Sequence, residues 1–153
     1  MILYHGSNVA IEKIDLAKSR PYKDFGKAFY LSESRGQAEE MAKFKTLTIG
    51  GTNTVTAFKV DDLSALNIKE FDSYTEEWAE FVFNNRDERQ QYTHPYDVVY
   101  GPIANDTVGV QIRDLRERKI SLDRFLENLK YNKGITFQYA FCTELAISKL
   151  TRL

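Results

Sequence analysis

Three residues of types that can carry chemistry lie far apart in this chain: His5, Tyr30 and Glu144. A carboxylate can stabilise positive charge that develops on a reacting group, as it does in glycoside cleavage. A tyrosine offers a flat ring face, which contributes about 1 kcal/mol beyond its burial, and a hydroxyl for a second contact. Gly6, which follows the histidine, leaves space for a ligand to approach the backbone closely. Brought together, these groups could hold a flat polar ligand and stabilise a cationic transition state.

Each of the three residues also has a purely structural interpretation. A histidine on an apolar strand is ordinarily a hydrogen-bonded core residue. Tyr30 stands between Phe29 and Leu31 and would normally pack in a core, and Glu144 follows Thr143 and favours the start of a helix. Considered one at a time, these residues therefore do not decide between a structural and a functional role.

Short apolar segments must position these residues. The apolar run 1–4 leads to a histidine and then to a glycine that ends it, which predicts a first strand with His5 at the lip of a cleft. Residues 26–32 predict a second short strand, and residues 135–142 predict a late one.

The rest of the chain predicts helices clustered between dispersed strands. Ser34, followed three residues later by Gln37, is typical of a capping box and opens a helix. The remaining predicted elements are a helix at 35–47, a strand at 54–60, a helix from 75 to about 86, a strand within 96–104, helices at 108–118 and 121–129, and a short helix at 143–150. This order favours an α+β domain with curved or split sheets over a regular parallel array. The chain has no Gly-x-Gly-x-x-Gly and no Gly-x-x-x-x-Gly-Lys-Ser/Thr, which removes the usual dinucleotide-fold and phosphate-loop interpretations.

Composition points to one domain over residues 1–153, because 42% hydrophobic and 13% aromatic residues can bury a substantial core. Cys142 is the only cysteine, so it cannot form an internal disulfide, and the lack of a Cys/His cluster argues against a metal site. The amino terminus lacks a basic segment followed by a long apolar run, and nowhere are there eighteen consecutive apolar residues. We therefore expect a soluble, cytoplasmic protein that does not engage a membrane.

The formal net charge of −1 hides an uneven distribution. Residues 1–60 hold nine Lys/Arg against six Asp/Glu, residues 61–110 hold three against eleven, and residues 111–153 hold nine against five. If the basic ends fold to one face, that face could attract an anion such as a dinucleotide or RNA. The alternative is three separately solvated faces, which the acidic isoelectric point favours.

Four blocks of sequence carry a resemblance to a known family: Leu-Tyr-His-Gly-Ser at 3–7, Lys-Asp-Phe-Gly-Lys-Ala-Phe-Tyr-Leu-Ser at 23–32, Tyr-Asp-Val-Val-Tyr-Gly-Pro-Ile-Ala-Asn-Asp-Thr at 96–107, and Phe-Cys-Thr-Glu-Leu-Ala at 141–146. They resemble, in the same order, a bacterial family catalogued as domain of unknown function 3990, which is similar to the ADP-ribosyltransferase superfamily. The resemblance spans nearly the whole chain. It implies an α+β fold with an ADP-ribosyltransferase-like, split two-sheet β core and flanking helices, which holds NAD in a cleft.

The resemblance also implies roles for individual residues. His5 would hydrogen-bond the adenosine-side ribose, and the backbone of Gly6 would grip the nicotinamide amide. Tyr30 would stack on the nicotinamide ring. Glu144 would be the catalytic glutamate, with a His-Tyr-Glu signature spread over three strands.

Two positions depart from the superfamily pattern. Many members have Glu or Gln two residues before the catalytic glutamate to engage an arginine or asparagine target, and Cys142 at that place argues against an arginine-modifying enzyme. The toxin branch usually has a second tyrosine eleven residues after the first, where this chain has Met41. Phe44 nearby could replace the second stacking ring as part of an apolar cofactor wall.

Further residues could contact the cofactor or the target. Arg86 at a helix end could hold a pyrophosphate, or pair with Asp87 or Glu88. Asn105 and Asp106 could contact ligand or target, although a turn and helix cap is an equal interpretation.

Lys23 and Lys27 flank a Phe-Gly pair and could steer a phosphate, but we favour exposed lysines without such a role. His94 precedes Pro95 in an extended, polar stretch and is predicted to be a loop residue.

The function that the resemblance implies is transfer of ADP-ribose from NAD to a protein or nucleic acid, with release of nicotinamide and without a metal. Family members often occur among toxin and phage-conflict genes, so a toxin with an antitoxin partner is also implied. Two alternatives stay open. One is an NAD glycohydrolase with water as acceptor, and the other is a non-catalytic module that binds NAD or nucleic acid.

Overall fold

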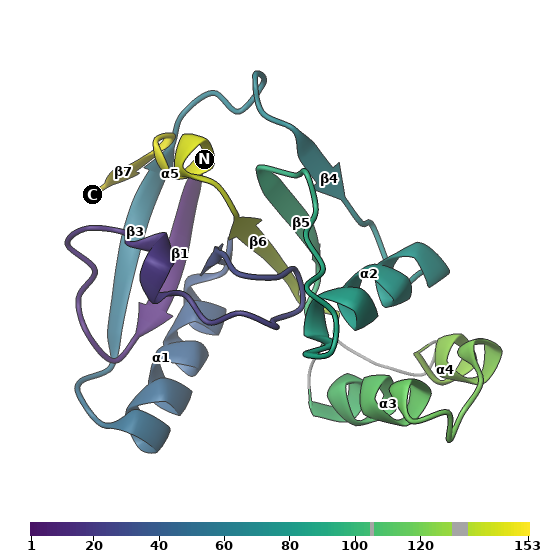
Figure 1. The fold of residues 1–153 in the computed structure, drawn as a ribbon. Coiled ribbons are helices and arrows are strands. Elements are labelled where there is room, and N and C mark those ends of the chain that lie inside the picture. Colours follow the sequence, from purple (N-terminus) through teal and green to yellow (C-terminus); the bar gives the residue numbers. More distant parts are fainter. Residues whose placement is uncertain (105, 130–134) are drawn as a thin grey trace.

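The structure is a computed structural model, and it describes residues 1–104, 106–129 and 135–153. Its elements are, in chain order, β1 (Ile2–Ser7), the 3-10 helix η1 (Leu16–Lys18), β2 (Phe29–Leu31), α1 (Arg35–Ile49), β3 (Thr54–Val60), β4 (Ile68–Glu70), α2 (Glu76–Arg86), β5 (Val98–Pro102), α3 (Asp106–Arg116), α4 (Leu122–Leu129), β6 (Phe137–Phe141), α5 (Glu144–Ile147) and β7 (Leu150–Arg152). Figure 1 shows how they are arranged.

The strands form two sheets. The first has the order β1-β3-β7 and is antiparallel, and the second has the order β2-β6-β5-β4, in which only the β4–β5 pair is parallel. An isolated bridge joins the sheets, because Tyr4 and Ser32 exchange two backbone hydrogen bonds of 2.8 Å each. The prediction of an α+β fold with two sheets is therefore confirmed.

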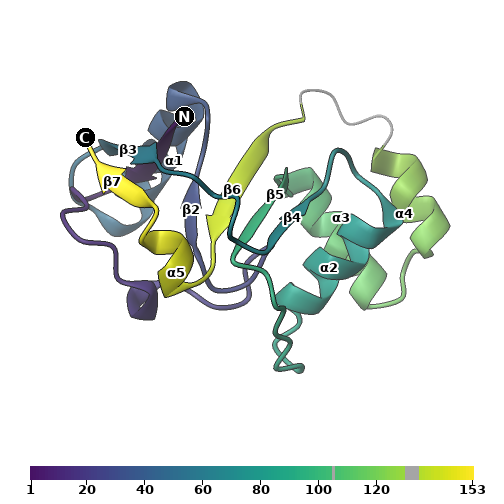
Figure 2. The ribbon, with the colours of Figure 1, turned by 90° about the horizontal axis from the view of Figure 1, so that it is seen from above.

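The second sheet is covered on both faces (Figure 2). Helices α2, α3 and α4 lie on one side of it, while the first sheet with α1 lies on the other. Because side chains alternate along a strand, neighbouring residues enter different cores. Val99 and Ala140 pack on the helical side, whereas Val98 and Phe141 pack between the sheets.

Helix α1 begins at a cap and packs directly on β1. Ser34 Oγ accepts from the Gln37 backbone N–H at 3.2 Å, as the predicted capping box requires. The reciprocal half of that box is not made, because the Gln37 side chain accepts from Ser32 Oγ instead. A Cβ atom on Gly6 would lie 1.8 Å from the Ala38 carbonyl oxygen, so only glycine allows this helix to lie so close to β1.

Helix α2 has the predicted bounds and fixes one face of the second sheet. Thr75 caps it by accepting from the Trp78 N–H at 3.2 Å, and Glu76 and Glu77 favour its positive end. The fully buried Trp78 donates its indole N–H to the Pro102 carbonyl at 3.1 Å, which ties the helix to β5.

The end of the chain differs from the prediction. The helix expected at 143–150 is limited to α5 (Glu144–Ile147), and the chain then re-enters the first sheet as β7. Leu150 pairs with Val60 there. The short edge strand β4 was likewise not predicted. Among the residues that the structure describes, no helix is both long enough and apolar enough to cross a bilayer.

Candidate functional site

The point where β1 meets β2 brings His5 and Tyr30 together through the backbone. His5 Nδ1 donates to the Tyr30 carbonyl oxygen at 2.6 Å, and the acceptor-only carbonyl fixes which ring nitrogen carries the proton. The imidazole stacks on Phe29, with ring centroids 4.2 Å apart and planes 22° from parallel. Phe29 and Tyr30 are neighbours on a strand, so their rings point to opposite faces of β2.

His5 is held in its neutral form. Burial and the positive charge of Lys45 together lower the pKa of His5 to about 4, although its bond to the Tyr30 carbonyl acts in the opposite direction. With Nδ1 protonated, the lone pair of Nε2 is an acceptor. No residue in the described part of the chain hydrogen-bonds this nitrogen, so it remains available to a ligand hydroxyl.

Gly6 presents its backbone polar groups on the edge of β1 that faces away from β3. Tyr4 uses its own N–H and C=O on that edge to bond Ser32, and backbone groups two residues apart on a strand point the same way. The Gly6 carbonyl accepts from Lys45 Nζ at 3.0 Å. An oxygen with two lone pairs can accept a further donor, so Gly6 has an amide-like donor and acceptor pair on this edge, although the residue is buried against α1.

Tyr30 is committed to the fold through its hydroxyl. That oxygen donates to the Gly26 carbonyl at 2.7 Å and accepts from the Phe25 N–H at 3.0 Å. Burial and the nearby carboxylate of Asp24 raise the pKa of Tyr30 well above its ordinary value. Only the ring face of Tyr30 can therefore serve a ligand, and Lys23 Nζ lies over the ring, 5.3 Å from its centroid.

Glu144 is not joined to this region. It is the first residue of α5, its side chain is exposed, and Thr143 caps the helix by accepting from the Ala146 N–H at 3.1 Å. Among the described residues, no hydrogen bond or ion pair connects Glu144 with His5 or Tyr30. The structure thus links two of the three predicted catalytic residues by a hydrogen bond, and Glu144 has no such link to them among the described residues.

The positions that depart from the superfamily pattern are now placed. Cys142 is largely buried, and burial raises the pKa of its thiol to about 12, so it is not a reactive thiolate. On α1, 44% of Met41 and 64% of Phe44 are exposed. The predicted apolar wall at Phe44 is consequently open to solvent.

Asp24 is the centre of a polar network that sequence reasoning missed. Its buried carboxylate accepts from Arg86 Nε at 2.7 Å, from the Ala104 N–H at 3.0 Å and from Gln138 Nε2 at 3.3 Å. Asp24 is the ion-pair partner of Arg86, while Asp87 pairs with Arg89. The network joins four separate segments, and the presence of Asp24 in the family block 23–32 was the signal that could have found it.

Other predicted contacts are placed as follows. Asn105 lies outside the described residues, and α3 begins at Asp106, whose side chain is outside them too. Lys23 and Lys27 are both exposed, as predicted. His94 lies outside helices and strands, as predicted, but its ring is half-buried and donates from Nε2 to the Phe25 carbonyl at 2.9 Å.

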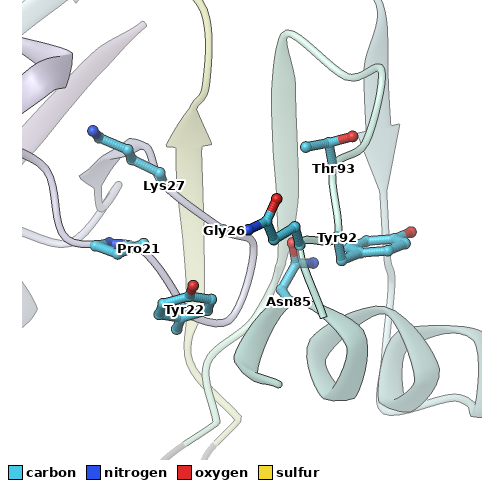
Figure 3. A pocket seen from close by; sticks show the side chains of 8 residues that line it. Pro21, Tyr22, Gly26, Lys27, Asn85, Tyr92 and Thr93 are labelled. Carbon is cyan, nitrogen blue, oxygen red and sulfur yellow. The ribbon is translucent and has the colours of Figure 1, made fainter. Parts of the chain in front are cut away.

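A pocket of about 230 Å³ opens between residues 21–27 on one side and Asn85 with residues 91–93 on the other (Figure 3). Tyr22 and Tyr92 supply its aromatic surface. None of the three predicted catalytic residues lines this pocket. It therefore does not coincide with the β1–β2 junction.

Fold and site together define a two-sheet α+β protein with a half-buried, neutral histidine at the junction of its sheets. A family model described as "Protein of unknown function (DUF3990)" matches residues 1–151, and the chain belongs to this family. Comparisons with curated proteins and with solved structures give no match.

Proposed function

We propose that the protein is an NAD-dependent ADP-ribosyltransferase that binds NAD at the β1–β2 junction. The observation that carries the proposal is the His5 ring, which is neutral, fixed by a 2.6 Å bond to the Tyr30 carbonyl, and without a hydrogen-bond partner at Nε2 among the described residues. A ribose hydroxyl is a donor that matches such an acceptor. The family resemblance assigns His5 this same partner.

Gly6 supports the placement of the nicotinamide end. A primary carboxamide has one acceptor oxygen and one donor NH₂, and the N–H and C=O of Gly6 complement both. These two groups lie on the edge of β1 that the first sheet leaves unpaired beyond Tyr4. The amide would then share the Gly6 carbonyl with Lys45.

Tyr30 supports stacking and not proton transfer. Both hydrogen-bonding capacities of its hydroxyl are engaged by the 25–26 backbone, and its raised pKa keeps it neutral. A stacked nicotinamide would take the ring face over which Lys23 Nζ lies, so the Lys23 side chain would move aside on binding. Such a contact would contribute about 1 kcal/mol beyond the area buried.

Glu144 has the catalytic role in the proposal. In the reaction the C1′–N bond of NAD breaks and nicotinamide leaves with the electron pair. An acceptor hydroxyl or amine forms the new bond to C1′ and releases its proton to solvent, whereas a carboxylate forms this bond without releasing a proton. A carboxylate near the ribose would stabilise the positive charge on the sugar. This assignment rests on the family resemblance, because Glu144 is exposed at the start of α5 and makes no hydrogen bond or ion pair with His5 among the described residues.

The experiment that tests the proposal is nicotinamide release from NAD in the presence of cell extract, with Glu144→Gln as the variant. We expect the variant to lose about 10²- to 10³-fold in rate, the usual effect of removing one transition-state contact. Glu88→Gln is the matched control, because Glu88 is an exposed carboxylate that lies outside helices and strands and has no predicted role in the reaction. Equal release by the wild type and Glu144→Gln would exclude the role proposed for Glu144.

The fate of labelled ADP-ribose distinguishes the versions of this activity. Label on protein or on nucleic acid identifies the acceptor class, and free ADP-ribose without labelled macromolecule identifies a glycohydrolase. Growth arrest on expression, relieved by a co-expressed neighbouring gene product, would support the toxin and antitoxin roles.

The position of Glu144 favours a second candidate, a module that binds NAD without cleaving it. In that case calorimetry would show NAD binding that depends on His5, while no nicotinamide would be released by the wild type. The two candidates share the β1–β2 junction and differ only in whether α5 takes part.

A further inference from the structure

The charges of two lysines, Lys45 and Lys23, act on His5, and that of Arg20 acts on both lysines. Lys45 projects from α1 onto the Gly6 carbonyl at 3.0 Å, and Lys23 lies over the Tyr30 ring. The positive charges of Lys23 and Arg20 both act on Lys45, and those of Lys45 and Lys23 act on His5. We call Arg20, Lys23 and Lys45 the cation cluster.

In the described part of the chain, no carboxylate pairs with the cluster. Among the described residues, none of its three members forms a salt bridge within 4.0 Å, whereas Arg35, Lys69, Arg86, Arg89 and Lys119 each do. The nearest carboxylate in sequence, Asp24, acts on Lys23 at a distance, but its oxygens are engaged by Arg86, Gln138 and a backbone N–H.

Lys45 is unlike a solvated surface lysine. Its side chain is half-buried and its ammonium is fixed on a buried strand residue. Burial, followed by the charges of Lys23 and Arg20, lowers the pKa of Lys45 to about 8. Like charges that converge without a counter-ion are relieved when an anion binds between them.

We propose that Lys45 and Lys23, assisted by Arg20, bind the diphosphate of a nucleotide ligand at the β1–β2 junction. The site deepens the proposed function, on which it rests for the identity of the ligand as NAD. The location is consistent with the other groups, since a diphosphate lies between the two riboses of NAD. On β1, Gly6 contacts Lys45 through its carbonyl, and His5 lies close enough for the charge of Lys45 to act on it.

The experiment measures binding of NAD, ADP-ribose, inorganic pyrophosphate and adenosine by calorimetry to the full chain. We expect Lys45→Met and Lys23→Met each to weaken binding of the three phosphate-bearing ligands by about tenfold, since charge-assisted contacts are lost. Lys43→Met is the matched control on the same helix, because Lys43 is exposed, and it should change affinity by no more than about twofold. Adenosine binding should be the same in all variants, and affinity for NAD should fall as salt is raised.

The outcomes separate this site from the proposed function. NAD binding that Lys45→Met and Lys23→Met leave intact would overturn the diphosphate site and leave the transferase proposal standing. Lysine-dependent binding of pyrophosphate, without binding or cleavage of NAD, would support the anion site and overturn the transferase proposal. Absence of binding of every phosphate-bearing ligand to the wild type would overturn both. If Lys45→Met does not fold, the exposed Lys23 carries the test alone.

Discussion

Each of the two histidines of the chain donates one ring nitrogen to a backbone carbonyl, and the two differ in whether the second nitrogen has a partner. His5 donates one ring nitrogen to the Tyr30 carbonyl, and His94 donates one to the Phe25 carbonyl. The second nitrogen of His94 accepts from the Tyr96 N–H at 3.2 Å, whereas that of His5 has no partner among the described residues. Both ring nitrogens of His94 are thus hydrogen-bonded within the fold, whereas Nε2 of His5 can still accept a hydrogen bond from a ligand.

Their surroundings differ in the same sense. His94 lies among aromatic rings, with centroids 5.1 Å from Phe81 and 5.5 Å from Tyr96. His5 has one aromatic neighbour, Phe29, and the cations Lys45 and Lys23 act on it. Burial is the leading cause that lowers the pKa of both residues, but only at His5 do positive charges add to it. A lowered pKa alone therefore does not distinguish a structural histidine from a functional one.

The largest expected effect is the loss of stability in His94→Ala. The change removes two hydrogen bonds at about 1 kcal/mol each and the ring contacts with Phe81 and Tyr96, so we expect about 3 kcal/mol less free energy of unfolding. NAD affinity per folded molecule should be unchanged. Urea denaturation, with calorimetry on the folded variant, measures both. A variant as stable as the wild type but unable to bind NAD would reverse the comparison.

The next largest effect is the loss of stability that His5 causes at acidic pH. A histidine whose pKa is lowered by folding gives stability that is present above 6.5 and is lost as the pH falls towards the folded value, about 4 for His5. At pH 5 this corresponds to a loss of roughly 2 kcal/mol from His5. In His5→Gln the loss between pH 6.5 and 5 should be smaller than in the wild type, because carboxylates contribute equally to both. Urea denaturation across this range checks the difference, and parallel curves would show that His5 does not titrate as described.

His5→Ala is expected to weaken NAD binding by about tenfold, since one hydrogen bond to the ligand is worth about 1 kcal/mol and its ring also positions the edge of β2. His94→Ala is the matched control for this change. Calorimetry with NAD at pH 7 measures it. Equal affinities of His5→Ala and the wild type would remove the observation on which the proposed function depends.

The sequence could predict the long elements because their signals are local. Ser34 and Thr75 each indicate the start of a helix, and in the structure each side chain caps that helix. The three-residue strands β4 and β7 were missed because partners distant in sequence create them. Leu150 continues a helical pattern locally, and only the nearby Val60 makes it a strand residue.

The sequence could predict which residues belong to the site, but not which of them contact one another. His5 and Tyr30 could each be placed on a strand, but nothing local shows that one residue holds the other through a carbonyl. In the sequence Lys45 occupies an ordinary position of the predicted helix. Its hydrogen bond to the Gly6 carbonyl cannot be predicted locally, because it depends on α1 packing closely against Gly6. Arg86 had carboxylates beside it in sequence, yet its partner Asp24 is 62 residues away.

Tyr30 connects the two histidines, and Tyr30→Phe is expected to leave both the NAD site and the acid response of His5 unchanged. Its carbonyl holds His5, while its hydroxyl bonds Gly26 and Phe25, and the Phe25 carbonyl holds His94. The substitution leaves the carbonyl and the ring in place, so NAD affinity and the acid sensitivity due to His5 should persist. It removes the hydroxyl and its two hydrogen bonds, so the free energy of unfolding should fall by about 2 kcal/mol. Urea denaturation at pH 7 and 5 measures both quantities, with Tyr22→Phe on an exposed tyrosine as control. A loss of the His5 acid response in Tyr30→Phe would show that the hydroxyl, and not only the carbonyl, positions His5, and the two histidines would then belong to one coupled unit.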